Sequence, residues 1–184
     1  QKLLDKKHRR YDESYWESRT MAPSSLIYYL GFNKKVEGLE HHNLFFDESF
    51  ETHADEIYEN PEWPKKPLFY VSCPSKIDPT VAPEGGENLF VLIPTAPDLK
   101  DTQEHRDNYL VIVFERMERL LGNTFKDNLV YCRSYAHADF TADYHAFKGN
   151  AYGLANTLKQ TAIFKPSMIN PKVKNLFYTG QLTT

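Results

Sequence analysis

Short apolar runs, separated by polar and proline-containing stretches, dominate the first hundred residues of this 184-residue chain and predict β-strands. The predicted strands cover residues 25–30, 42–46, 68–73 and 88–94. Residues 74–86 carry Pro, Asp and Gly-Gly turn signals, so we expect the two flanking strands to form a long hairpin. The acidic stretch 49–58 has the length of a short helix.

A helix after residue 101 is the clearest local element. Asp101 and Glu104 have the spacing of a capping box, in which the first side chain accepts the amide three residues on and the second reaches back. Gly122 supplies a left-handed stop at the other end. The apolar residues that recur at helical spacing, and so predict one face packed on a sheet, are Leu110, Val113, Phe114, Met117, Leu120 and Leu121.

The remaining pattern predicts a strand near 128–135, a short helix from His137 and a last strand at 175–179. Strands outnumber helices, and hairpin-like spacings dominate. The pattern therefore favours an α+β fold, a mainly antiparallel sheet with a few packed helices, over a doubly wound sheet.

Composition and charge change this picture little. Aromatic residues make up 14% of the chain, enough for a core and also suited to a site for a long apolar ligand. With 22 basic and 25 acidic residues, the net charge of -3 does not indicate a nucleic-acid-binding protein. No run approaches the roughly 20 apolar residues that a membrane span needs. Cys73 and Cys132 form neither a disulfide framework nor a metal-binding spacing.

Candidate catalytic chemistry is sparse. One polar cluster comprises His137, Asp139, Asp143 and His145. Tight metal sites usually have two histidines at helical spacing or cysteines, and Asp139 serves equally well as a helix cap. His41 and His42 would point to opposite faces of a strand. Neither a Gly-x-Ser-x-Gly nucleophile nor a Gly-x-Gly-x-x-Gly phosphate loop occurs. We therefore predict no metal site and assign no catalytic residue.

The segment 148–160 combines small and aromatic residues. Gly149, Ala151 and Gly153 would let the backbone approach a flat neighbour closely. That neighbour is either another part of the fold or a flat ligand such as a flavin ring or a polyene. In the second interpretation Tyr152 and Gln160 form the aromatic and polar edges of the wall.

Several pieces of the sequence occur in a diagnostic order. They are residues 11–16, Pro23-Ser24-Ser25 with Tyr29-Leu30-Gly31, Leu39 with His41-His42, residues 70–83, Leu92-Ile93-Pro94, and the C-terminal landmarks from Phe140 to Gly180. No single piece is specific, but together they resemble the bacterial phytoene desaturases. These are FAD-dependent carotenoid desaturases of the amine-oxidase-like flavoprotein superfamily.

This resemblance implies a fragment of an oxidoreductase that removes hydrogens from a long isoprenoid such as phytoene. Residues 1–174 would be an incomplete substrate-binding domain, and 175–184 a strand returning to an FAD-binding domain absent from this chain. Gly180 and Gln181 would contact FAD, whereas Tyr152, Gly153 and Gln160 would line the substrate. Because the nucleotide-binding fold and the turn after residue 184 are missing, we expect the fragment alone to be inactive and not to hold FAD.

Two alternatives remain open from the sequence. One is an isoprenoid-binding module without redox activity, which would have no nucleotide-binding half in its gene. The other is a related flavoprotein acting on another carotenoid or a retinoid. The resemblance also implies a cytoplasmic protein bound peripherally to the inner face of the cell membrane, with basic residues near the N-terminus, at 34–35 or at 65–66 as candidate contacts.

Overall fold

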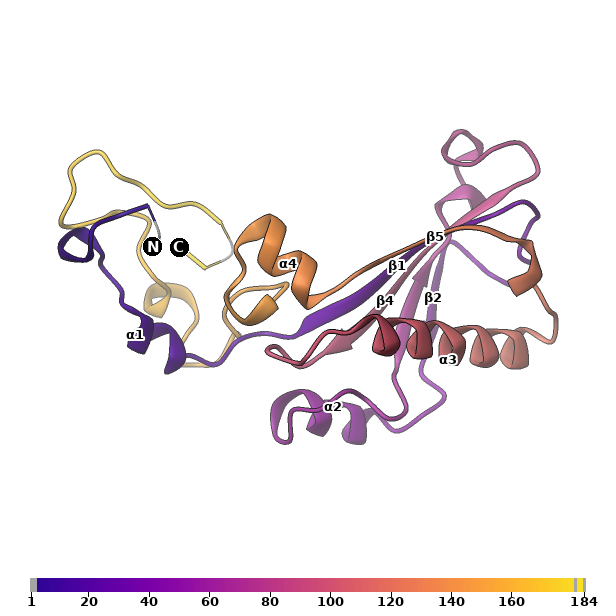
Figure 1. The fold of residues 1–184 in the computed structure, drawn as a ribbon, viewed down its shortest axis with the longest axis horizontal. Helices are drawn as coiled ribbons and strands as arrows, with labels where there is room; N and C mark the ends of the chain where they lie inside the picture. The colour runs from indigo at the N-terminus through magenta and orange to yellow at the C-terminus, as the bar shows by residue number, and fades with distance from the viewer. Residues whose placement is uncertain (1–2, 181, 184) are drawn as a thin grey trace. The chain divides into compact units, whose positions relative to one another are not determined.

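Figure 1 shows the fold in a computed structural model, which describes residues 3–180 and 182–183. The chain forms two compact units. Residues 23–151 are called the sheet unit, and residues 1–22 with 152–184 the terminal unit. The predicted boundary at residue 174 separates a substrate-binding part from a flavin-domain strand, and that assignment remains a prediction.

The sheet unit contains a five-stranded antiparallel sheet with strand order β2-β3-β4-β1-β5. Its strands are β1 (Ser24–Phe32), β2 (His42–Phe45), β3 (Phe69–Ser72), β4 (Glu87–Thr95) and β5 (Leu129–Tyr135). Its helices are α2 (Phe50–Tyr58), α3 (Gln103–Leu121) and α4 (His137–Tyr144). The pairing of β3 with β4 confirms the predicted hairpin, and the α+β class with a mainly antiparallel sheet is confirmed.

One face of the sheet packs against α3 and forms the core. In β1, the alternate residues Leu26, Tyr28 and Leu30 are almost completely buried and join the same apolar cluster as Val113 and Met117 of α3. Strand β4 alternates strictly between buried and half-buried residues along its whole length. Such a period of two places one set of side chains in the core and the other set on the opposite face.

The ends of α3 differ from the sequence prediction at two residues, Asp101 and Leu120. Thr102, not Asp101, is the N-cap, because its hydroxyl accepts the amide of His105 at 3.2 Å. Asp101 is instead bound to Arg106, which lies on the first turn of the helix. Gly122, with a φ of 72°, ends the helix as predicted. Leu120, predicted on the apolar face, is 48% exposed.

A buried carboxylate ties the hairpin to the loop after β1. The side chain of Glu87 is inaccessible to solvent and forms ion pairs with Lys35 at 3.2 Å and Lys76 at 3.1 Å. It also accepts the Ser75 hydroxyl at 2.6 Å and the Val36 amide at 3.3 Å. Burial alone would raise its pKa, but these four donors hold the pKa of Glu87 below its ordinary value.

The terminal unit contains little regular structure. Its described residues form one short α-helix, α1 (Glu13–Glu17), two 3-10 turns at Lys6–His8 and Ala162–Phe164, and two isolated bridges, Met21 with Leu154 and Ile169 with Phe177. The predicted strand at 175–179 is wrong, since Phe177 forms only one of these single bridges. Its apolar residues resemble a strand locally, but a strand needs a partner along its length.

Candidate functional site

The face of the sheet opposite α3 is apolar and incompletely covered. We use the term open face for the surface formed by six side chains that project from this side of the sheet: Leu44, Tyr70, Phe90, Leu92, Tyr29 and Tyr131. Leu44 on edge strand β2 is 67% exposed, Tyr131 on edge strand β5 is 55% exposed, and Tyr29 on the interior strand β1 is 42% exposed, so large apolar side chains are exposed across the sheet. Five strands at about 4.8 Å spacing span about 19 Å across this face, a dimension suited to an elongated ligand.

Aromatic rings form a continuous row across the open face. The rings of Tyr70 on β3 and Phe90 on β4 have centroids 6.4 Å apart. Phe90 in turn lies edge-on to Tyr29 on β1, with centroids 5.6 Å apart. Edges and faces of such rings give an apolar, polarisable surface, which complements a conjugated or branched hydrocarbon chain.

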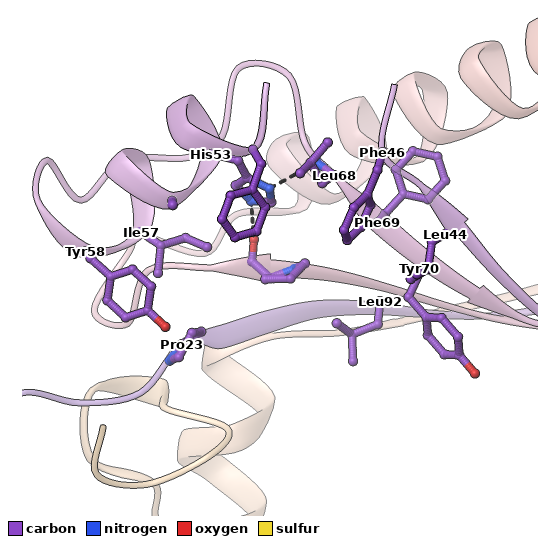
Figure 2. A pocket seen from close by; sticks show the side chains of 13 residues that line it. Pro23, Leu44, Phe46, His53, Ile57, Tyr58, Leu68, Phe69, Tyr70 and Leu92 are labelled. Carbon is purple, nitrogen blue, oxygen red and sulfur yellow. Dashed lines mark hydrogen bonds between the residues drawn. The ribbon is translucent and has the colours of Figure 1, made fainter. Parts of the chain in front are cut away.

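A cavity of about 290 Å³ opens beside α2, where β3 begins and β4 ends (Figure 2). In Figure 2, Leu92 and Tyr70 project from the sheet on one side of this region, while Ile57 and Tyr58 come from α2. Almost all of its lining is hydrocarbon or aromatic. A ligand seated there would gain from apolar burial rather than from hydrogen bonds.

His53 also lines this cavity, and both nitrogens of its imidazole form hydrogen bonds within the fold. Its Nδ1 accepts the Leu68 amide at 3.1 Å, so the proton lies on Nε2, which donates to the Pro94 carbonyl at 2.9 Å. Burial lowers the pKa of His53 below its ordinary value. The imidazole therefore holds α2 against β3 and β4 in its neutral form.

A second cavity, of about 520 Å³, lies farther along the same face, between β1, β4 and β5. Tyr29, Phe90 and Tyr131 line it, and Gly31 forms part of its floor. A Cβ at Gly31 would lie 3.2 Å from the Cβ of Tyr131, so a larger residue here would push against that ring. The ring row thus connects two apolar cavities on one face.

At the edge strand β2, the open face ends in two histidines. The rings of His41 and His42 stack with centroids 3.9 Å apart, contrary to the prediction of opposite faces, because the strand begins only at His42. His42 Nδ1 lies 2.5 Å from the Tyr70 hydroxyl, which fixes that ring at the margin of the aromatic row. The polar atoms here lie at the rim rather than in the middle of the face.

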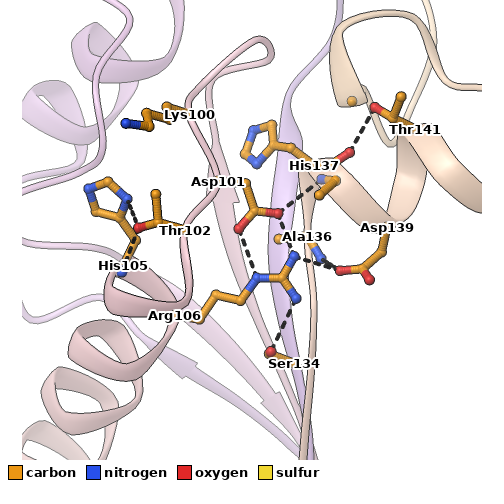
Figure 3. A network of polar contacts seen from close by, with 12 residues as sticks. Lys100, Asp101, Thr102, His105, Arg106, Ser134, Ala136, His137, Asp139 and Thr141 are labelled. Carbon is orange, nitrogen blue, oxygen red and sulfur yellow. Dashed lines mark hydrogen bonds and ion pairs between the residues drawn. The ribbon is translucent and has the colours of Figure 1, made fainter.

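The polar cluster around α4 is structural (Figure 3). Asp139 accepts the Ala136 amide at 2.9 Å, the capping role considered from the sequence, and pairs with Arg106 at 2.7 Å. Asp101 accepts from Arg106 and from the Ala138 amide. Burial would raise the pKa of Asp101, but these contacts bring that pKa below its ordinary value. Arg106 thereby joins the start of α3 to the start of α4.

His137 belongs to the same region and is almost fully buried. Its Nε2 donates to the Ala96 carbonyl at 2.8 Å, and its Nδ1 has no hydrogen-bond partner. Burial lowers its pKa below the ordinary value. Across residues 3–180 and 182–183, no three His, Cys, Asp or Glu side chains converge as they would around a metal ion.

The sequence-predicted substrate residues lie in the terminal unit. Gln160 is 5% exposed; its Oε1 accepts the Thr20 amide at 2.9 Å, and its Nε2 donates to the Thr20 carbonyl at 2.8 Å and the Ala155 carbonyl at 3.2 Å. Tyr152 is 47% exposed, and Gly153 has a φ of 82°. Their predicted contact with substrate remains a prediction.

Three further residues were singled out from the sequence: Gly149 in the small-residue segment, and Gly180 and Gln181 as predicted flavin contacts. Gly149, in the sheet unit, packs on the backbone of His137, where a Cβ would come within 2.8 Å, so its neighbour is part of the fold. Gly180 has a φ of 127°, and a Cβ there would meet no atom within 4 Å. Gln181 lies outside the described residues.

Comparison with known proteins decides the family. The chain is 42% identical over 182 residues, 99% of its length, to the carotenoid 3,4-desaturase of Haloarcula japonica, of which it covers 37%. It is 32% identical over its whole length to the zeta-carotene-forming phytoene desaturase of Myxococcus xanthus, covering 35% of that protein. The chain is homologous to a segment of the carotenoid desaturases.

This segment spans about a third of the length of these carotenoid desaturases. No protein-family model matches it. A solved oxidoreductase from Methanosarcina mazei covers 99% of this chain at 15% identity, with a TM-score of 0.45, and the chain covers 34% of that structure. Among the described residues, no helix combines the length and apolar character needed to cross a bilayer.

The open face of this segment was missed in the sequence analysis, although the sequence contains a signal for it. Strand β4 carries large apolar residues on both of its faces. Leu89 and Val91 point toward α3, and Phe90 and Leu92 point away from it. An antiparallel sheet that faces water on one side usually alternates apolar with polar residues. Two apolar faces therefore indicate that something other than water meets the second face.

Proposed function

We propose that this segment forms one wall of the carotenoid-binding site of an FAD-dependent desaturase. The observation that carries the proposal is the open face, a row of aromatic and aliphatic side chains joining two apolar cavities. A long isoprenoid has no group to offer a hydrogen bond, so its recognition depends on apolar area and shape. The relatives support the proposal because both are carotenoid-pathway desaturases by name.

The proposed substrate is a carotenoid or a precursor such as phytoene. Removing two hydrogens from neighbouring carbons and forming a double bond requires a hydride acceptor, which FAD supplies when bound and no amino-acid side chain can replace. Since such substrates dissolve in bilayers, we propose that the whole desaturase works peripherally at the cytoplasmic face of the cell membrane.

Flavin contacts within this chain would be limited. The open side of Gly180 has room for a flat group to approach its backbone. However, residues 3–180 and 182–183 contain no glycine-rich turn leading into a helix, which is the usual pyrophosphate site. We therefore expect the chain alone not to retain FAD after mixing and gel filtration. Stoichiometric flavin absorbance in the protein peak would contradict this expectation.

The wall can be tested in a full-length desaturase that includes this segment. Phe90→Asp places a charge in the middle of the aromatic row, and we expect at least a tenfold loss of carotenoid desaturation, because a carboxylate next to a hydrocarbon must remain hydrated. The matched control is Val111→Asp, an exposed apolar position on α3 away from this face. Equal activity of the two variants, each folded and loaded with FAD, would overturn the proposal.

A further inference from the structure

The terminal unit lacks the core that a folded unit of its size needs. It has 55 residues, and its buried apolar side chains among those described are Met21, Leu154 and Pro166. Domains of this size bury only part of their surface even with a complete core and are marginally stable. Met21 and Leu154 bridge each other, and among the described residues neither belongs to the apolar core cluster, which lies in the sheet unit.

Large apolar side chains of this unit instead face outward. Leu158 is 90% exposed, Ile163 89% and Phe164 61%, all within a stretch of seven residues. We call Leu158, Ile163 and Phe164, with the flanking Lys159 and Lys165, the 158–165 surface. Exposed apolar groups gathered in this way usually mark a contact surface.

The charge of the terminal unit differs sharply from that of the rest. It carries ten Lys and Arg against four Asp and Glu, and residues 152–184 contain no acidic residue. The sheet unit carries twelve Lys and Arg against 21 Asp and Glu. Its net charge is therefore -9, whereas that of the terminal unit is +6. A basic surface with apolar centre fits a partner that is apolar in the middle and acidic at the rim.

We propose that the 158–165 surface packs against the remainder of the desaturase polypeptide, the nearly two thirds of its relatives' length that this chain does not cover. The inference rests on the proposed function, since it takes the chain to be part of such an enzyme. The remainder supplies the missing apolar partner surface, with acidic residues opposite Lys159 and Lys165. The terminal unit thus completes its fold on that remainder.

The test uses this chain and, as a separate polypeptide, the part of the Haloarcula japonica carotenoid 3,4-desaturase outside the matched segment. We expect the two to co-purify and expect amides at 158–165 to exchange at least ~10-fold more slowly in the complex. The double variant that carries Leu158→Asp and Ile163→Asp should bind the second polypeptide at least ~10-fold more weakly. The control, Ile77→Asp with Val111→Asp, changes two exposed apolar residues of the sheet unit and should leave binding unchanged.

Charge reversal gives a second measurement. Lys159→Glu with Lys165→Glu should weaken binding at low salt and flatten its salt dependence, because rim charges mainly contribute long-range attraction. Binding of the chain to vesicles containing phosphatidylglycerol, without binding to the remainder, would overturn the proposal in favour of a lipid surface. Failure to bind either probe, or equal binding by both pairs of aspartate variants, would also overturn it.

The outcomes separate this inference from the proposed function. A complex that forms through 158–165 but leaves carotenoids unchanged when loaded with FAD would refute the function and keep the contact. A full-length enzyme that desaturates carotenoids equally well with Leu158→Asp and Ile163→Asp, and exchanges amides at 158–165 rapidly, would keep the function and refute the contact.

Discussion

The two units of this chain are stabilised in different ways. The sheet unit has an apolar core between its sheet and α3, with buried ion pairs at its margin. In the terminal unit, by contrast, the buried amide side chains of Gln160 and Asn170 bond to backbone groups far away in the sequence. A short chain can thus contain one region that folds on its own core and another that needs a surface from elsewhere.

The largest expected effect comes from the core. Met117 is fully buried on α3 against the sheet, so Met117→Ala should lower the free energy of unfolding of the sheet unit by about 3 kcal/mol, through lost burial and the cavity left behind. Denaturant titration followed by circular dichroism measures this change. Leu158→Ala, a similar truncation at a 90% exposed position, should change it by less than about 0.5 kcal/mol. Similar losses for both would remove the contrast between the units.

The buried carboxylate gives the next effect. Glu87→Gln keeps the shape but removes the charge that pairs with Lys35 and Lys76, and should cost about 2 kcal/mol. Because the folded-state pKa of Glu87 is lowered, its contribution is present above its unfolded pKa and is lost as pH falls through the folded value. Denaturant titrations at neutral and acidic pH should show the variant to be less sensitive to acid. Exposed Glu84, changed to Gln, is the control, and an equal effect at both positions would contradict the assignment.

Two buried histidines predict a second pH effect at higher pH. Burial lowers the folded-state pKa of both His53 and His137, so the unfolded chain binds protons more readily as pH falls below about 6.5. The melting temperature of the sheet unit should therefore fall between pH 7 and pH 5. His137→Gln retains a donor for the Ala96 carbonyl but cannot titrate, so it should reduce this dependence. A melting temperature that is constant over this window would contradict the prediction.

Much of the sheet unit could be predicted because its strands and α3 are defined by local patterns. The runs at 25–30 and 88–94 coincide with β1 and β4, and Gly122 ends α3 as expected. The prediction failed where the structure depends on distant partners. The apolar residues at 175–179 have no strand to pair with, and Asp101 is bound by Arg106 and Ala138 instead of capping the helix.

The candidate site was predicted less well, for a related reason. Sequence order and small residues drew attention to 148–160, whereas the open face combines single residues from different strands, such as Tyr70, Phe90 and Tyr29. Their spacing in the sequence carries no sign of this row; only strand order and register bring them together. Likewise, no local pattern shows that Gln160 bonds to Thr20, 140 residues earlier.

That long-range amide contact provides the most local of the predicted effects and the sharpest test of how the terminal unit is held. Gln160→Leu keeps the approximate volume but removes one acceptor and two donors to Thr20 and Ala155, so the local free energy of opening should fall by about 1–3 kcal/mol. Hydrogen exchange at Thr20 and Ala155 should accelerate, while amides of β1 and β4 keep their rates.

Lys159→Ala, the exposed neighbour, is the matched control for Gln160→Leu and should leave these exchange rates unchanged. If Gln160→Leu accelerated exchange in β1 and β4 as strongly as at Thr20, the amide would support the whole chain rather than the terminal unit. If it accelerated exchange nowhere, the terminal unit would be held by contacts other than its buried amides. Only local acceleration agrees with a unit that relies on hydrogen bonds in place of an apolar core.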